Sequence, residues 1–89
     1  SHNKEEEIIE KATTLSEGLY LFTMDTCPNC NVAKHLLKDT VYTEMDSYQN
    51  AELVKALKIM TAPTLVVVRD KATEIYPGVG NITVYLKNH

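Results

Sequence analysis

The pattern of apolar and polar residues predicts alternating strands and helices in the first half of the chain. Residues 19–24 are almost all apolar, which is typical of a strand buried on both faces. Apolar residues then recur at helical spacing in residues 31–38, and a second strand is predicted at residues 41–46. A strand, a helix and a strand in so short a stretch form a βαβ unit, so we expect the two strands to be parallel.

The second half of the chain is predicted to form a helix, a β-hairpin and a final helix. The hairpin contains the most β-prone run of the chain, and Arg69, Asp70 and Lys71 supply its polar turn. Residues 77–80, which contain proline and glycine, are expected to interrupt the secondary structure before the final helix. In chain order, these elements are predicted at residues 51–57, 65–68, 73–76 and 81–87.

A further helix is predicted at residues 3–17, where apolar residues recur at intervals of three and four. Gly18 is a candidate for the residue that ends this helix. We expect a single domain over residues 1–89, in which residues 1–17 form a helical extension. Residues 1–2 are interpreted as the remnant of a tag.

Composition and charge narrow the class of protein. Of the 89 residues, 44% are hydrophobic and 24% are charged, which is ordinary for a soluble globular domain. The chain has no apolar run near the length of a membrane span and no hydrophobic signal peptide, so we expect no membrane association. A formal charge of −3 argues against nucleic acid as the main partner. Two cysteines with no others fit a reducing compartment, so we expect a cytoplasmic protein, and we take it to be a monomer.

The two cysteines, Cys27 and Cys30, stand between the first predicted strand and the helix that follows it. A helix N-terminus carries about half a positive charge and unpaired backbone N–H groups, both of which stabilise a thiolate. The pKa of a cysteine at such a position falls from about 8.5 into a range of about 3.5–7.5. Pro28 suits the first turn of a helix, where a missing N–H costs nothing. Because the thiolate is the form that attacks disulfides, the pair predicts thiol–disulfide chemistry.

Helical spacing predicts different roles for the two sulfur atoms. At about 100° per residue, the predicted helix has one apolar stripe. This stripe is formed by Val32, Ala33, Leu36 and Leu37. Cys30 lies at the edge of the stripe, whereas Cys27 points toward water. We therefore predict that Cys27 is the nucleophile and that Cys30 resolves the mixed disulfide.

Two other roles for a cysteine pair are weaker interpretations. A structural disulfide that closes so small a loop contributes about 2 kcal/mol at most to the stability of the fold, which is less than one that closes a longer loop. A structural zinc site needs four ligands as a rule, of which the pair supplies two. His35 points away from both sulfurs on the predicted helix, and His2 and His89 are at the chain ends. We expect neither a bound metal ion nor another cofactor.

Two motifs together resemble the thioredoxin/glutaredoxin superfamily. One is Cys27-Pro28-Asn29-Cys30 after a strand, and the other is Ala62-Pro63-Thr64 before a β-hairpin. Their spacing, and the glycine-rich turn into a final helix, are similar to that superfamily from about residue 19 to the end of the chain. The resemblance implies an α/β protein with the thioredoxin fold, a four-stranded mixed sheet flanked by helices, here with an extra N-terminal helix.

The resemblance also implies roles for individual residues. Cys27 becomes the attacking thiol and Cys30 the resolving thiol. Pro63 is expected to follow a cis peptide bond and to face the cysteine pair, with the backbone of Ala62 open to pair with an extended substrate. Without the resemblance, a trans proline at the start of a strand is the simpler interpretation, since only about 5–6% of X–Pro bonds are cis. The residues implied to contact substrate are Thr26, Pro28, Asn29, Ala62, Pro63, Gly78 and Gly80.

The chain departs from both branches of the superfamily in ways that bear on its partners. It has no tryptophan and so lacks the W-C-G-P-C motif of typical thioredoxins. Glutaredoxins usually carry basic residues before the first cysteine and near the cis-proline, whereas this chain has Met24, Asp25 and Met60 there. Asp25 would repel both a thiolate and the carboxylates of glutathione. The glycine-rich turn at residues 78–80 resembles one that contacts glutathione, although an ordinary entry into a helix is the simpler interpretation.

These features favour a thiol–disulfide oxidoreductase that reduces disulfides in partner proteins. We expect an upstream reductase of the thioredoxin-reductase type rather than glutathione, and a downstream partner such as ribonucleotide reductase. Two alternatives stay open: a glutathione-dependent glutaredoxin, and a binding module that holds a [2Fe–2S] cluster through Cys27.

Overall fold

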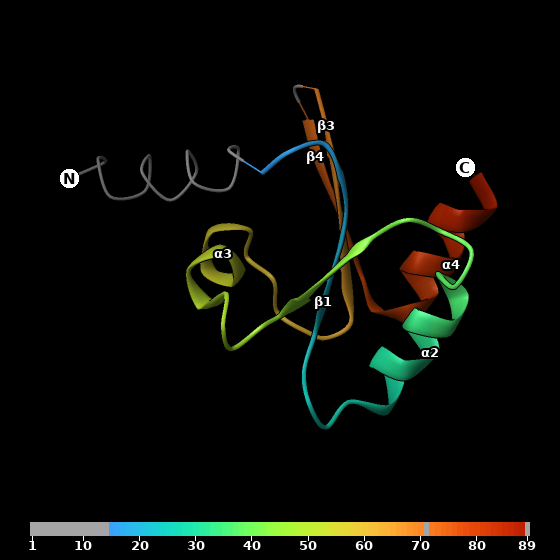
Figure 1. Ribbon diagram of the computed structural model, residues 1–89, viewed down its shortest axis with the longest axis horizontal. Helices are drawn as coiled ribbons and strands as arrows, with labels where there is room; N and C mark the ends of the chain where they lie inside the picture. The colour runs from blue at the N-terminus through green and yellow to red at the C-terminus, as the bar shows by residue number, and fades with distance from the viewer. Residues whose placement is uncertain (1–14, 71, 89) are drawn as a thin grey trace.

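Seven helices and strands make up the part of the chain that the structure describes, residues 15–70 and 72–88 of a computed structural model (Figure 1). No helix in these ranges is both long enough and apolar enough to cross a membrane. The bounds of the elements are β1 Gly18–Thr23, α2 Pro28–Leu36, β2 Thr43–Asp46, α3 Ala51–Ala56, β3 Thr64–Arg69, β4 Ala72–Pro77 and α4 Gly78–Asn88.

The strands form one mixed sheet in the order β2-β1-β3-β4. β1 and β2 are parallel, with Tyr20 opposite Thr43, as expected for strands joined through a helix. β3 runs antiparallel to both β1 and β4, and Leu21 stands opposite Leu65. α2 and α4 lie together on one face of the sheet, and α3 lies on the other (Figure 1). The described residues thus form three layers, with β1 and β3 in the middle of the sheet.

The central strands are buried because helices cover both of their faces. Successive side chains of a strand point to opposite faces, so neighbours in sequence enter different cores. Leu21 and Leu65 pack with α2 and α4, whereas Phe22 and Val66 pack on the side of α3. All four side chains are wholly buried. The nearly continuous apolar runs of the sequence therefore correspond to strands with two covered faces.

From residue 18 onward, the predicted order of strands and helices and the parallel β1–β2 pair are confirmed, and the element bounds lie within a few residues of the predicted ones. The start of α4 is a correction. This helix begins at Gly78, so residues 77–80 do not separate β4 from the final helix. Gly78 has a φ of 82°, a left-handed conformation that glycine adopts without a steric penalty. The chain can therefore turn directly from strand into helix.

The predicted N-terminal helix lies largely outside the described residues. Residues 15–17, which fall at its predicted end, are not helical. Gly18 is the first residue of β1 rather than the end of a helix. The extra helix stays a prediction for residues 3–14.

The buried side of α2 differs from the predicted stripe. The helix begins at Pro28, the residue expected in its first turn, and so starts three residues before the range predicted from apolar spacing. Ala33 and Leu37 are wholly buried, but Val32, which was predicted to share their stripe, is 45% exposed. The reason is tertiary: the sheet and α4 contact the side of the helix that Ala33 and Leu37 share with Cys30.

We expect Phe22→Ala to destabilise the protein by about 3–5 kcal/mol, because it removes the largest side chain that is wholly buried among the described residues. Urea unfolding followed by circular dichroism, with the disulfide intact, measures the free energy of unfolding. Val41→Ala is the control, since Val41 is 92% exposed and surface substitutions change stability by about 0.5 kcal/mol or less. Equal effects of the two substitutions would contradict the position of Phe22 in the core.

Candidate active site

Cys27 is the N-cap residue of α2, at the end of the turn that follows β1. Its backbone is extended, with φ −133° and ψ 97°, and Pro28 takes the first helical position. The backbone N–H of Cys30 donates to Sγ of Cys27 over 3.0 Å. An N-cap side chain usually offers an oxygen to such an N–H, so here a sulfur takes the capping role. The same N–H and the positive end of the helix favour a Cys27 thiolate in the reduced protein.

The two sulfurs are joined in a disulfide, and they differ in exposure. The Cα atoms of Cys27 and Cys30 are 5.2 Å apart. Cys30 is 2% exposed, whereas Cys27 is partly exposed. A thiolate that approaches from outside therefore meets the Cys27 sulfur first. This difference agrees with the side-chain directions predicted from helical spacing, while the roles of nucleophile and resolving thiol stay a prediction.

The segment before β3 lies against Cys27. The Ala62–Pro63 peptide bond is cis, as the sequence resemblance implied. The carbonyl oxygen of Ala62 lies 3.7 Å from Sγ of Cys27, and Pro63 is wholly buried. The backbone N–H of Gly78 donates to the carbonyl oxygen of Pro63 over 2.8 Å. This hydrogen bond ties the cis-proline to the start of α4.

The other residues implied to contact substrate lie at different positions relative to Cys27 and the cis-proline. Three exposed residues flank Cys27 in the turn and at the start of α2: Thr26, Pro28 and Asn29. Gly78 is connected to the site through its hydrogen bond to the cis-proline. Gly80 is exposed on the first turn of α4, with open space where a side chain would begin. A substrate-binding role for these residues stays a prediction.

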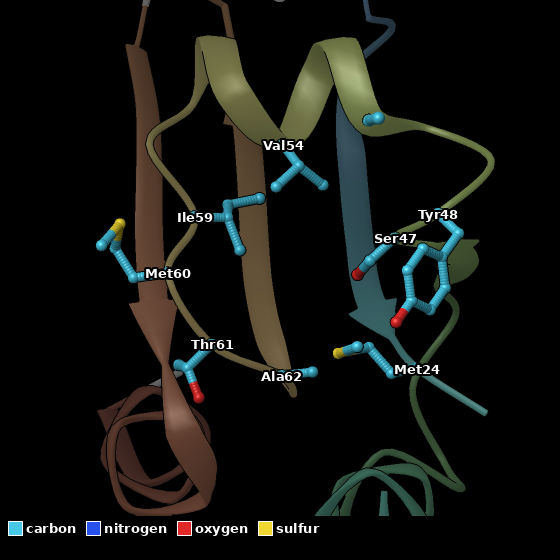
Figure 2. A pocket seen from close by; sticks show the side chains of 9 residues that line it. Met24, Ser47, Tyr48, Val54, Ile59, Met60, Thr61 and Ala62 are labelled. Carbon is cyan, nitrogen blue, oxygen red and sulfur yellow. The ribbon is translucent and has the colours of Figure 1, made fainter. Parts of the chain in front are cut away.

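An apolar pocket of about 280 Å³ opens beside the cis-proline segment (Figure 2). Its walls come from the end of β1, the loop before α3, α3 itself and the segment that leads to the cis-proline. The residues that line it are Met24, Ser47, Tyr48, Ala51, Val54, Ile59, Met60, Thr61 and Ala62. In the sequence, Met24 and Met60 are notable only because they stand where glutaredoxins usually carry basic residues. The sequence does not reveal the pocket, because the walls come from segments that are far apart in the chain.

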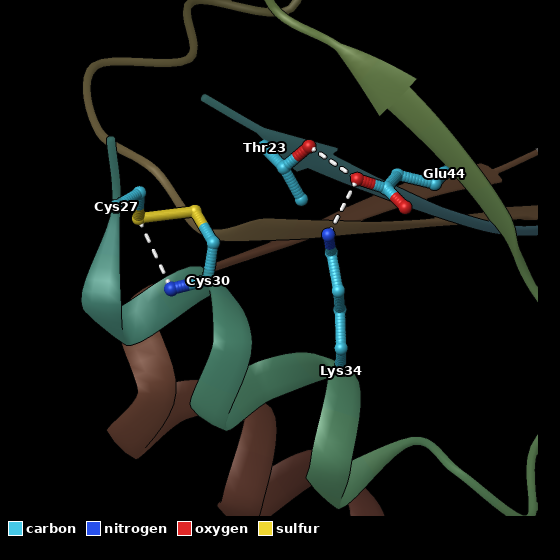
Figure 3. Close-up of polar contacts among 5 residues, drawn as sticks. All are labelled: Thr23, Cys27, Cys30, Lys34 and Glu44. Carbon is cyan, nitrogen blue, oxygen red and sulfur yellow. Dashed lines mark hydrogen bonds and ion pairs between the residues drawn. A yellow bond between two sulfur atoms is a disulfide. The ribbon is translucent and has the colours of Figure 1, made fainter. Parts of the chain in front are cut away.

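A polar network lies near the disulfide, between β1, β2 and α2 (Figure 3). Oγ1 of the buried Thr23 donates to Oε2 of Glu44 over 2.9 Å, and Nζ of Lys34 lies 2.9 Å from the same oxygen. The hydrogen bonds from Lys34 and Thr23 hold the pKa of Glu44 below its usual range, and the bond to Glu44 raises the pKa of Lys34. Lys34 stands one helical turn after Cys30, which is a signal visible in the sequence. The place of Glu44 follows only from the pairing of β2 with β1.

We expect the Lys34–Glu44 ion pair to contribute about 0.2–1 kcal/mol to stability, because both side chains are more than one-third exposed. A double-mutant cycle with Lys34→Met and Glu44→Gln measures this coupling free energy. Folding lowers the pKa of Glu44, so the contribution is fully present above the usual glutamate range. It is lost as the pH falls through the lowered value. A coupling that is unchanged between neutral pH and strong acid would contradict this assignment.

Solved structures, among them a glutaredoxin and a thioredoxin, resemble this chain over most of its length, whereas no protein-family model and no curated sequence matches it. A buckwheat glutaredoxin, solved in complex with glutathione, has a TM-score of 0.69 at 17% identity, with coverage of 99% of this chain and 86% of the glutaredoxin. A thioredoxin from Trypanosoma brucei brucei has a TM-score of 0.64 at 15% identity, with coverage of 93% and 80%. The chain therefore has the thioredoxin fold, as the resemblance of its two sequence motifs implied.

Proposed function

We propose that this protein is a dithiol–disulfide oxidoreductase that reduces disulfides in partner proteins through Cys27 and Cys30. The observation that carries the proposal is the position of Cys27, a partly exposed N-cap sulfur bonded to a buried cysteine beside the cis-proline. An accessible sulfur that is stabilised as a thiolate is suited to attack a disulfide, and a shielded neighbour is suited to resolve the product. A purely structural disulfide requires none of these features.

The reaction has two exchange steps that together move two electrons. The Cys27 thiolate attacks one sulfur of the substrate disulfide, and the other substrate sulfur leaves as a thiolate that takes up a proton from water. The Cys30 thiol then loses its proton and attacks Sγ of Cys27, which releases the second substrate thiol. The substrate disulfide becomes two thiols, and the Cys27–Cys30 pair is oxidised to the disulfide that the structure contains.

The charges around Cys27 support a reductase of the thioredoxin-reductase type as the electron source. Glutathione carries two carboxylates and one ammonium, so its binding gains from cations close to the sulfur. Asp25 is an exposed anion two residues before Cys27, and Met24 and Met60 carry no charge. Lys34, on α2, already forms an ion pair with Glu44 on β2. The site therefore offers little electrostatic attraction to glutathione.

Two other functions compete with this proposal. A glutathione-dependent glutaredoxin is supported by the similarity to the buckwheat protein. A [2Fe–2S] cluster takes four protein ligands as a rule. The chain has two cysteines, of which Cys30 is buried, and within residues 15–70 and 72–88 no three His, Cys, Asp or Glu side chains are placed to hold a metal. These residues do not fit a cluster held by one copy of the chain, so we derive no step through a cluster.

We expect Cys30→Ser to trap the first step of the reaction. Cys27 can still attack, but resolution is lost, so a mixed disulfide between protein and substrate accumulates. With insulin as the substrate, intact-mass measurement under non-reducing conditions detects this adduct. Cys27→Ser is the matched control, and since the remaining Cys30 is 2% exposed, we expect neither adduct nor insulin reduction. Insulin reduction by Cys27→Ser at the wild-type rate would refute the dithiol mechanism.

We expect glutathione with glutathione reductase to reduce the oxidised protein more slowly than thioredoxin reductase with NADPH does. An exposed ion pair contributes about 0.2–1 kcal/mol, so two missing cations weaken glutathione binding about 2- to 30-fold. The double substitution Met24→Lys with Asp25→Thr should raise the glutathione-dependent rate and lower the Cys27 pKa, because it makes the site more positive.

Val41→Lys is the control for added charge, since Val41 is exposed and lies outside the pocket wall. It should change neither the glutathione-dependent rate nor the Cys27 pKa. Efficient, saturable glutathione turnover by the wild type, unaffected by the double substitution, would replace this proposal with the glutaredoxin one.

A further inference from the structure

Exposed apolar side chains gather around the pocket beside the cis-proline segment (Figure 2). Met24 is 38% exposed, Tyr48 is 72% exposed and Met60 is 91% exposed. Grouped apolar side chains on a surface commonly mark a binding site, whereas single ones need no explanation. Methionine side chains are flexible and polarisable, so they adapt to apolar partners of different shapes.

The size and the chemistry of the pocket favour an apolar side chain as its occupant. Its volume of about 280 Å³ exceeds the roughly 150 Å³ of an engineered apolar cavity that takes up benzene. Val54 and Ile59 contribute aliphatic surface to it, and no charged side chain is among those that line it. A charged group that entered would lose its water without gaining an ionic partner, which is unfavourable.

The pocket and the sulfur that would hold the substrate have a neighbour in common, Ala62. Ala62 lines the pocket, and its carbonyl oxygen lies 3.7 Å from Sγ of Cys27. A substrate segment whose cysteine is bonded to Cys27 and whose chain runs past Ala62 meets the pocket. An extended chain advances about 3.3 Å per residue, so a residue one or two positions from that cysteine comes within reach of the pocket.

We infer that this pocket binds a large apolar side chain, such as leucine, methionine or phenylalanine, one or two residues from the substrate cysteine that bonds to Cys27. The inference rests on the proposed function and names its substrate class, extended protein segments with an apolar residue near the cysteine. The exposed Asp25, next to Met24, disfavours an acidic neighbour at this position. Glutathione has no large apolar side chain and cannot fill the pocket.

A set of short peptides tests the inference. Each peptide has blocked ends and one central cysteine that carries thionitrobenzoate in a disulfide, with leucine, serine, lysine or glutamate as the residues beside the cysteine. Attack by Cys27 on the cysteine sulfur releases the coloured thiolate, and Cys30 then displaces the peptide thiol, so the dithiol supplies both electrons. We expect the leucine peptide to react about 5- to 30-fold faster than the serine peptide, as partial burial of a leucine side chain implies.

Two substitutions test whether the preference for the leucine peptide comes from the pocket or from a general preference for apolar surface. Met60→Ser removes an exposed part of the wall, and Ala51→Phe fills the pocket from the first residue of α3. Both should lower the leucine-to-serine rate ratio about 2- to 5-fold, because each reduces the area that leucine buries. A general preference for apolar surface would instead make Ala51→Phe raise the ratio.

Val41→Ser is the matched control for Met60→Ser, since the two side chains are 92% and 91% exposed and Val41 is not part of the pocket wall. It should leave the ratio unchanged. Hydroxyethyl disulfide, which has no side chain to bind, should be reduced at the same rate by the wild type and by Val41→Ser.

A leucine-to-serine ratio near one in the wild type, or a ratio that neither Met60→Ser nor Ala51→Phe changes, overturns the inference. A preference for the glutamate peptide overturns it in favour of an anionic ligand. A wild-type dimer in sedimentation that Met60→Ser converts to a monomer overturns it by assigning the pocket to a second copy of the chain. Reduction of hydroxyethyl disulfide without peptide preference leaves the proposed function standing. If no disulfide is reduced, the proposed function fails and this inference fails with it.

Discussion

The hydrogen bond from the Cys30 N–H to Sγ of Cys27 is the interaction on which the geometry of the candidate site depends. It makes a sulfur the cap of α2, where unpaired N–H groups and the positive end of the helix dipole meet. Cys30 follows at a sequence separation of 3, nearly one helical turn later, and it points into the core. The spacing of the motif therefore leaves one sulfur accessible and shields the other, while both remain within bonding distance.

The sheet brings the second half of the site to this helix end. β1 and β3 are antiparallel neighbours, and Phe22 near the end of β1 stands opposite Thr64 at the start of β3. The turn that carries Cys27 follows β1, and the cis-proline segment precedes β3, so strand pairing places the two together. Because both strands are covered on two faces, little freedom is left for this register to shift. Burial of the central strands thus fixes the positions of the cysteine pair and the cis-proline, which lie where β1 ends and β3 begins.

The surroundings of α2 and α3 differ in polarity, and this difference underlies the proposed preference for protein substrates. Beside α2, the positive charge of Lys34 is balanced by Glu44, which also accepts a hydrogen bond from Thr23. Beside α3 lies the uncharged pocket, with the exposed Met60 in its wall. The charge nearest to Cys27 in sequence is the exposed carboxylate of Asp25. An anionic tripeptide finds few favourable charges at such a site, whereas an apolar side chain can exclude water from it.

Interactions between neighbouring residues were enough to predict the first strand, the position of the cysteine pair after it and the helix that follows. The signals were an apolar run, a proline at the first helical position and helical spacing, and all three are local. The same spacing predicted that Cys30 is covered and Cys27 is not. The exposure of Val32 could not be predicted this way, since the packing of α4 and the sheet decides which side of α2 is buried. Nor could the start of α4, because a glycine such as Gly78 can either interrupt a helix or begin one. The place of Glu44 and the pocket were decided by tertiary structure alone, since both depend on strand pairing and layer packing between segments that are distant in the chain.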